Sequence, residues 1–216
     1  MQLVLVRHAQ PVRAAVTGGP ADPELTALGR EQAARVPNVL AALSSPERPI
    51  TRVVASPQRR ARDTAVPTAD RLGVELEIVD DLAEYDRDLP VYIPIEDAGA
   101  AGAHELLRAQ YDRIKAGHLP EQIDAGAFVS RVHKAVDGLV SAAGPSDTVV
   151  VFAHGGVINV LLQDVLSLAR PLTFPIDYCS VTRVLYSRTG TRTAATINEN
   201  GHVWDLLPRN LRPAAG

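Results

Sequence analysis

Cysteine is nearly absent from this chain: Cys179 is the only one in 216 residues. A single thiol cannot form an intramolecular disulfide, and it excludes a structural zinc site built on paired thiolates. We therefore expect a protein of a reducing compartment, which for a chain of this kind is the cytoplasm.

Long hydrophobic runs are missing as well. The N-terminal stretch MQLVLVRHAQ has no basic region before its short apolar run, which argues against a secretory signal peptide. No segment approaches 18 consecutive apolar residues, so we expect neither a membrane span nor a membrane partner. A glycine-rich nucleotide loop is also absent, which argues against a kinase or another P-loop enzyme.

Charge of one sign is not in excess, because 22 basic residues face 25 acidic ones and the net charge is −3. This balance argues against nucleic acid as a partner. Only Lys115 and Lys134 are lysines, so we expect any phosphate contact to come from an arginine guanidinium. Hydrophobic residues make up 46% of the chain, which is enough for a sizeable core.

What the chain does contain is an alternation of apolar β-type runs and helical patterns. The expected strands cover residues 2–6, 51–55, 74–79 and 148–153, followed by an antiparallel pair at 181–187 and 192–197. The expected helices cover residues 27–43, 57–72, 103–116, 127–143 and 157–168. Thr26 and Ser56 are the expected N-caps of the first two helices, and Pro37 predicts a kink or an early end.

This order predicts a single three-layer α/β/α domain over residues 1–216, with a mainly parallel central sheet and an antiparallel C-terminal strand pair. The region at about 80–126 interrupts the alternation with an irregular, acidic stretch. We expect it to be an insertion that covers the substrate. The oligomeric state cannot be read from the sequence.

Polar residues follow three of the expected strands. Arg7 and His8 end the first, an arginine cluster at 59–62 follows the second, and His154-Gly155-Gly156 follows the fourth. Ligands of α/β sheets bind beyond the carboxyl ends of the strands, and arginine forks match phosphate oxygens. The two glycines and the helix after them would let backbone N–H groups approach a phosphate. One histidine could attack phosphorus while the other, protonated, donates a hydrogen bond.

A family resemblance joins these pieces. The motifs are LVRHAQ at 5–10, LTALGREQA at 25–33, SPQRRARDTA at 56–65, LAE at 82–84 and FAHGG at 152–156, and the tail VTRVLY…INENGHV follows them. In this order the chain resembles the histidine phosphatase superfamily, the phosphoglycerate mutase-like group, along nearly its full length. The resemblance implies that His8 is the phosphorylated nucleophile, that Arg7, Arg60 and His154 form the phosphate pocket, and that Glu84 is the general acid.

The same resemblance implies a phosphatase that hydrolyses phosphomonoesters of small molecules without a metal or another cofactor. Two other readings stay open: a phosphoglycerate mutase, or a phosphate-ester binding module without turnover. Ala9 replaces the usual glycine after the histidine, and the stretch after Glu84 departs from the family, so Asp81, Asp86 and Asp88 are alternative acids. The candidates for contact with the leaving group are Tyr85, Arg87, Tyr92, Arg108, Tyr111 and Arg113.

Overall fold

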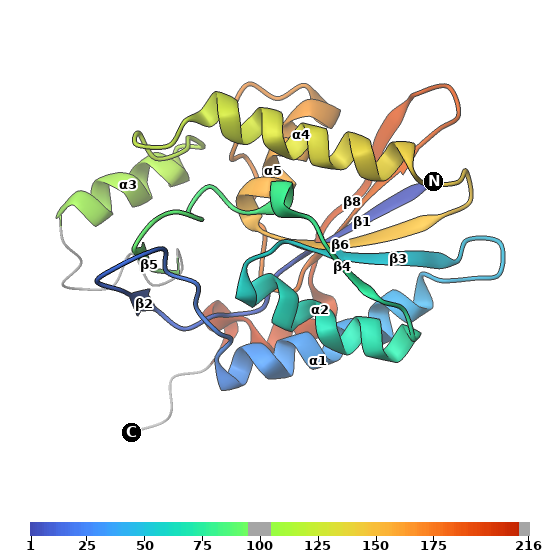
Figure 1. Ribbon diagram of the computed structural model, residues 1–216, viewed down its shortest axis with the longest axis horizontal. Helices are drawn as coiled ribbons and strands as arrows, with labels where there is room; N and C mark the ends of the chain where they lie inside the picture. Colours follow the sequence, from blue (N-terminus) through green and yellow to red (C-terminus); the bar gives the residue numbers. More distant parts are fainter. Residues whose placement is uncertain (95–104, 212–216) are drawn as a thin grey trace.

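A six-stranded sheet forms the centre of the protein, in a computed structural model that describes residues 1–94 and 105–211 (Figure 1). Its order is β4 (Leu76–Ile78), β3 (Ile50–Ala55), β6 (Thr148–Ala153), β1 (Gln2–Arg7), β7 (Val181–Tyr186) and β8 (Arg192–Glu199). The first four strands are parallel, whereas β7 runs antiparallel to β1, and β8 to β7. The predicted fold class is thereby confirmed.

Helices cover both faces of this sheet. In Figure 1, α1 (Ala27–Ala42) and α2 (Arg59–Leu72) lie on one face, and α4 (Ala125–Ser141) and α5 (Gly155–Leu166) on the other. Leu3 and Leu5 of β1 join the apolar cluster under α4 and α5. Val4 and Val6 join the cluster under α1 and α2. Successive strand residues point to opposite faces, and burial on both explains why β1 is an uninterrupted apolar run.

Helix α1 begins where the sequence predicts. The Thr26 side chain accepts a hydrogen bond from Gly29 N at 2.8 Å, a cap that contributes about 1 kcal/mol in typical helices. The predicted early end at Pro37 is wrong, because the helix continues to Ala42 with Pro37 buried against the core. The tertiary packing of this face outweighs the backbone hydrogen bond that the proline removes.

Helix α2 begins two residues later than predicted, at Arg59 with Gln58 as its N-cap. Ser56 is therefore not the cap. The carboxylate of Asp22, from a distant loop, accepts the N–H of Arg59 at 2.7 Å, so a tertiary contact caps this helix. Gly73 ends α2 with φ +64°, a conformation that favours glycine.

The region at about 80–126 starts with a 3₁₀ turn, Asp80–Leu82, and contains β5 (Val91–Tyr92) and α3 (Glu105–Lys115). β5 pairs with β2 (Ala14–Ala15), and both lie beyond the carboxyl ends of the central strands in Figure 1. The expected start of α3 at residue 103 lies outside the described residues. Two 3₁₀ helices, Gly201–Leu206 and Pro208–Asn210, close the described chain.

No helix of the described segments combines the length and the apolar character that a membrane crossing requires. The cytoplasmic location expected from the sequence stays a prediction.

Candidate active site

Two histidines meet at the carboxyl edge of the sheet because β1 and β6 are parallel neighbours. Arg7 is in register with Ala153, so the residues that follow them, His8 and His154, lie side by side. Their ring centroids are 5.1 Å apart at an interplanar angle of 59°, and both side chains are buried. The parallel pairing of β1 with β6 therefore assembles the pair that the sequence separates by 146 positions.

His8 is oriented as a nucleophile. Its Nδ1 lies 2.8 Å from the Ala9 carbonyl, which can only accept, so Nδ1 carries the proton. Burial lowers the pKa of His8 well below its ordinary value, and the nearby guanidinium groups of Arg60 and Arg7 lower it further. The neutral ring then has its lone pair on Nε2, which accepts a hydrogen bond from Arg60 Nε at 3.3 Å. This is the atom that can attack phosphorus.

Arg60 is the arginine that the fold brings to His8. Its side chain is 1% exposed, whereas Arg59 and Arg62 lie on the exposed side of α2. Arg60 Nη2 donates to both oxygens of Asp86, at 2.8 and 3.0 Å. Its Nη1 is buried and has no hydrogen-bond partner within the described part of the chain. A buried guanidinium nitrogen of this kind is a ready donor for a phosphate oxygen.

Arg7 is held by the segment that precedes β7. Its Nη1 donates to the Ile176 carbonyl at 2.5 Å, and its guanidinium lies over the Tyr178 ring at 4.1 Å. The same ring is 5.8 Å from the ring of His8. Tyr178 therefore supports both residues of the first motif, through a cation–π contact and ring packing.

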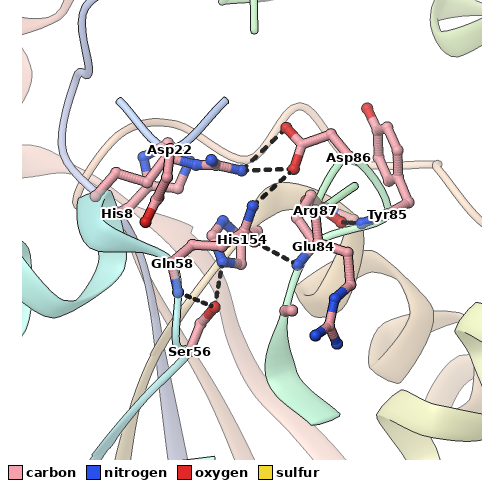
Figure 2. Close-up of polar contacts among 12 residues, drawn as sticks. His8, Asp22, Ser56, Gln58, Glu84, Tyr85, Asp86, Arg87 and His154 are labelled. Carbon is pink, nitrogen blue, oxygen red and sulfur yellow. Dashed lines mark hydrogen bonds and ion pairs between the residues drawn. The ribbon is translucent and has the colours of Figure 1, made fainter. Parts of the chain in front are cut away.

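The surroundings of His154 favour a neutral ring, whereas the sequence suggested a protonated donor. Burial lowers the pKa of His154 well below its ordinary value, and Arg60, His8 and Arg7 add to the effect. Its Nε2 lies 2.7 Å from Ser56 Oγ, which also accepts the N–H of Gln58 (Figure 2). In the described part of the chain His154 Nε2 is the acceptor within reach of the Ser56 hydroxyl, so we assign the hydroxyl proton to this hydrogen bond and the ring proton to Nδ1.

Nδ1 of His154 is buried and has no partner among residues 1–94 and 105–211. A neutral imidazole with its proton there can donate to a phosphate oxygen. The pocket therefore offers donors on Arg60 and on His154 around the nucleophilic Nε2 of His8.

Glu84 lies buried against the first turn of α5, which begins directly after His154. Its Oε2 accepts the N–H of Gly156 at 2.8 Å, and its Oε1 accepts the N–H of Tyr85 at 3.0 Å. Burial, and then the charge of Asp86, raise the pKa of Glu84 to about 7. A carboxyl group with this pKa can hold a proton near neutral pH and release it to a leaving oxygen.

Gly156 serves Glu84 rather than a phosphate, which corrects the expectation from the sequence. A Cβ at position 156 would lie 2.3 Å from Glu84 Oε1, so only glycine lets the carboxyl group dock there. At position 155 the nearest atom to such a Cβ is Arg7 Nε, at 3.9 Å. The two glycines of one motif therefore have different roles.

The alternative acids have other partners. Asp86 accepts hydrogen bonds from Arg60 and, at 2.9 Å, from Gln58 Nε2. Asp81 lies 3.4 Å from Lys134 Nζ at the surface, and the side chain of Asp88 is 87% exposed. Among these carboxylates the geometry favours Glu84 as the acid.

The candidates for leaving-group contact are only partly brought to the site. Tyr92 lies against Arg60, whose guanidinium is 4.5 Å from the ring centre, and Tyr85 follows Glu84 directly and packs edge-on against Phe128. On α3 the candidates make other contacts or face solvent: Arg108 is exposed, the ring of Tyr111 contacts Lys115, and Arg113 donates to the Leu119 carbonyl. Arg87 is half-buried beside Glu84 in Figure 2.

Sequence reasoning missed the supporting roles of four residues. Thr64 accepts the N–H of Ala9 and donates to the Arg60 carbonyl, and it stands in the motif at 56–65 that could have identified it. Ser56 stands in the same motif but was assigned to helix capping. The sequence offered Asp86 only as an alternative acid, with no signal for its pairing with Arg60, and it has no signal that links Tyr178 to the site. Ala9 itself is buried in the core cluster of α1 and α2.

No group of three or more His, Cys, Asp or Glu side chains suited to a metal ion occurs in the segments that the structure describes. The absence of a metal requirement stays a prediction.

Comparisons with known proteins place the chain among phosphatases. A glucosyl-3-phosphoglycerate phosphatase of Mycolicibacterium vanbaalenii is 36% identical over 176 residues, which are 77% of this chain and 75% of that protein. The structure of a mycobacterial glucosyl-3-phosphoglycerate phosphatase with inorganic phosphate superposes with a TM-score of 0.68 at 27% identity, covering 94% of this chain and 99% of the other.

A phosphoserine phosphatase variant from Entamoeba histolytica shares the fold, with a TM-score of 0.66 at 19% identity over 94% of this chain and 98% of the other. The family model of the histidine phosphatase superfamily, branch 1, matches residues 3–199. The match spans both histidines, the arginines around them and the carboxylate beside the second histidine. The chain therefore belongs to the histidine phosphatase superfamily.

Proposed function

We propose that this histidine phosphatase hydrolyses phosphomonoesters through a phosphohistidine on Nε2 of His8. The observation that carries the proposal is the hydrogen bond from His8 Nδ1 to the Ala9 carbonyl. It fixes the ring proton on Nδ1 and leaves the Nε2 lone pair in a pocket of buried donors. A neutral imidazole held in this way is an activated nucleophile.

In the first step, His8 Nε2 attacks phosphorus and forms a P–N bond while the P–O bond to the alcohol breaks. The leaving oxygen takes the proton of Glu84, so a neutral alcohol departs. Arg7, Arg60 and His154 donate to the phosphoryl oxygens, whose charge develops in the transition state. These donors are already in position before the reaction begins. They therefore stabilise the transition state without any reorganisation of the site, which is their contribution to the rate.

In the second step, a water molecule attacks phosphorus and the P–N bond breaks. The Glu84 carboxylate takes the proton of that water, which restores the protonated acid and neutral His8 and releases inorganic phosphate. Positive charge comes from guanidinium groups alone, so the scheme needs no metal.

The substrate that we propose is a phosphorylated small molecule with an alkyl leaving group. A carboxyl group able to donate a proton near neutral pH is needed when the leaving alkoxide is strongly basic. The similarity to proteins called glucosyl-3-phosphoglycerate phosphatase supports phosphorylated sugars or sugar acids as the first compounds to test. We propose that the region at about 80–126 covers the alcohol part.

The decisive experiment is to trap the intermediate. Enzyme mixed with a phosphomonoester is quenched in base, because phosphoramidates are labile in acid, and is mapped by mass spectrometry. We expect phosphate on His8, and neither a trapped intermediate nor turnover in His8→Ala. Phosphate on another residue, or full activity in His8→Ala, would overturn the proposal.

Hydrolysis and mutase action are separated by a coupled assay. We expect inorganic phosphate from the alkyl phosphates and little 2-phosphoglycerate from 3-phosphoglycerate primed with 2,3-bisphosphoglycerate. Robust formation of 2-phosphoglycerate would favour the mutase, and binding without turnover would favour the non-catalytic module.

A further inference from the structure

The phosphate pocket contains a carboxylate of its own. We propose that Asp86 weakens the hold of this pocket on inorganic phosphate by occupying one edge of Arg60, and that it thereby favours release of the product. The inference rests on the proposed function, because it assigns the phosphate to Arg60 and His154. It makes Asp86 a specificity-determining residue for the charge of the bound group.

The geometry of Asp86 is that of an anion bound to Arg60. Both oxygens accept from Arg60 Nη2, at 2.8 and 3.0 Å, and Oδ1 also accepts from Gln58 Nε2 at 2.9 Å (Figure 2). The Arg60 side chain is 1% exposed and that of Asp86 is 14% exposed. Water therefore screens this pair little, and the carboxylate acts on anything that binds next to it.

The remaining donors place the phosphate beside this carboxylate. Arg60 Nη1 and His154 Nδ1 are buried without partners in the described part of the structure, and Arg60 Nε faces the nucleophile. A phosphoryl group that takes Nη1 binds to the same guanidinium as Asp86. Two anions then share one cation, so each weakens the binding of the other. This penalty falls on the free phosphate that is left after hydrolysis as well as on the phosphoryl group of the substrate.

Asp86 is not needed to fix the acid loop, because other contacts do so. Gln58 Oε1 accepts the N–H of Glu84 at 2.7 Å. The backbone carbonyls of Glu84 and Asp86 accept the N–H groups of Arg87 and Leu89, at 3.2 and 2.9 Å. The Glu84 carboxyl group is bound by Gly156. Removing the charge of Asp86 should therefore leave Glu84 where it is.

The test is the affinity for inorganic phosphate, measured by calorimetry with the full-length parent and with Asp86→Asn, which keeps the shape and removes the charge. We expect Asp86→Asn to bind phosphate about tenfold more tightly, and the inhibition constant of phosphate as a product to fall by a similar factor. The matched control is Asp88→Asn, two residues along the same loop and exposed, which should stay within twofold of the parent.

The direction in which the affinity for phosphate changes tests the inference. If Asp86 were only an anchor that holds Arg60, its loss would weaken phosphate binding, and unchanged or weaker binding would overturn the inference. Asp86→Ala should tighten binding as well, and thermal melts check that both variants fold. If neither variant folds, the claim that the loop is fixed without this carboxylate is wrong, and the inference fails with it. A parent that binds no phosphate at all would instead overturn the proposed function.

Discussion

At the scale of single residues, the site depends on where three protons lie. The His8 proton is fixed by a carbonyl, the His154 proton by a hydroxyl, and the Glu84 proton by burial next to Asp86. None of these groups is exposed, so their protonation is set by the fold rather than by solvent.

Glu84→Gln should distinguish substrates by their leaving group. An alkoxide needs the proton of Glu84, a contribution of about 10²–10⁴-fold, whereas p-nitrophenolate leaves without it. We expect a loss of that size in kcat for alkyl phosphates and a much smaller loss for p-nitrophenyl phosphate. The basic limb of the pH profile, which for the parent lies near the raised pKa of about 7, should also disappear for alkyl substrates. Equal losses for both classes would make Glu84 a structural residue.

Ser56→Ala should change the tautomer of His154. Without the hydroxyl at 2.7 Å the ring proton is no longer confined to Nδ1, and the pocket loses a fixed donor. Loss of one such donor costs about 10²-fold or more in kcat. Nitrogen-15 shifts of His154 report the tautomer directly, and a ring that keeps its proton on Nδ1 in the variant would contradict the assignment. Ser130→Ala, on the exposed side of α4, is the control.

The residues of the site were predictable where they follow strand ends. Arg7, His8 and His154 stand directly after apolar runs, and Arg60 was selected by its place in the motif at 56–65. Their contacts were not predictable, because each partner comes from a distant segment. Asp86 lies 26 positions from Arg60, and Tyr178 lies 171 positions from Arg7, so no local pattern links them.

At the scale of elements, the N-terminus of α5 serves two purposes, since its first two glycines face different groups. The pair allows a matched test, in which the same methyl group is added at adjacent positions. Gly156→Ala places a Cβ 2.3 Å from Glu84 Oε1, whereas Gly155→Ala meets only Arg7 Nε at 3.9 Å.

We therefore expect Gly156→Ala to expel the Glu84 carboxyl group, with losses of activity like those of Glu84→Gln and a destabilisation of about 1–3 kcal/mol. Gly155→Ala should retain most of its stability. Kinetics on alkyl and aryl phosphates, with urea unfolding of both variants, provide the comparison. Equal behaviour of the two variants would refute the separate roles.

The elements themselves were largely predictable, because apolar runs in this chain end sharply at polar residues. β6 has the predicted bounds, and the other main strands differ by at most two residues at either end. The predicted start of α2 is wrong, because Ser56 and Pro57 have the local pattern of a helix start. In the structure the Ser56 hydroxyl is instead bound to His154 of another segment. A partner 98 positions away overrides the local preference.

At the scale of the whole molecule, stability depends on the buried ionisable groups. His8 and His154 have lowered pKa values, so below about pH 6.5 the unfolded chain binds protons that the folded protein does not. Their contribution to the free energy of unfolding is thus present above pH 6.5 and is lost as the pH falls. Glu84 acts in the opposite direction. Its pKa is raised to about 7, so its contribution to the free energy of unfolding is lost as the pH rises through 7.

Glu84→Gln should therefore make stability rise more steeply with pH than in the parent, by about 1.4 kcal/mol per pH unit between pH 5 and 6.5. Urea unfolding at several pH values measures this slope. A variant with the slope of the parent would show that the Glu84 carboxyl group is not protonated in the folded protein in this range.

Activity should survive exhaustive treatment with EDTA, because arginine side chains supply the positive charge around the phosphoryl group. Rates on an alkyl phosphate before and after chelation, with Mg²⁺, Mn²⁺ and Zn²⁺ added back, test this. Loss of activity with EDTA, and its recovery with one of these ions, would show that a metal belongs to the site.

The position of β1 at the middle of the sheet has a consequence for how the protein is made. All six residues of β1 are buried, and its parallel neighbour β6 begins at Thr148, about 140 residues later in the chain. At synthesis rates of about 5–20 residues per second, β1 has left the ribosome roughly 7–30 seconds before β6 exists. During that time neither edge of the apolar strand β1 has its native partner, because β7 follows β6 in the chain. Nascent chains that stop before Thr148 should accordingly bind chaperones or aggregate, whereas chains that extend past β7 should not.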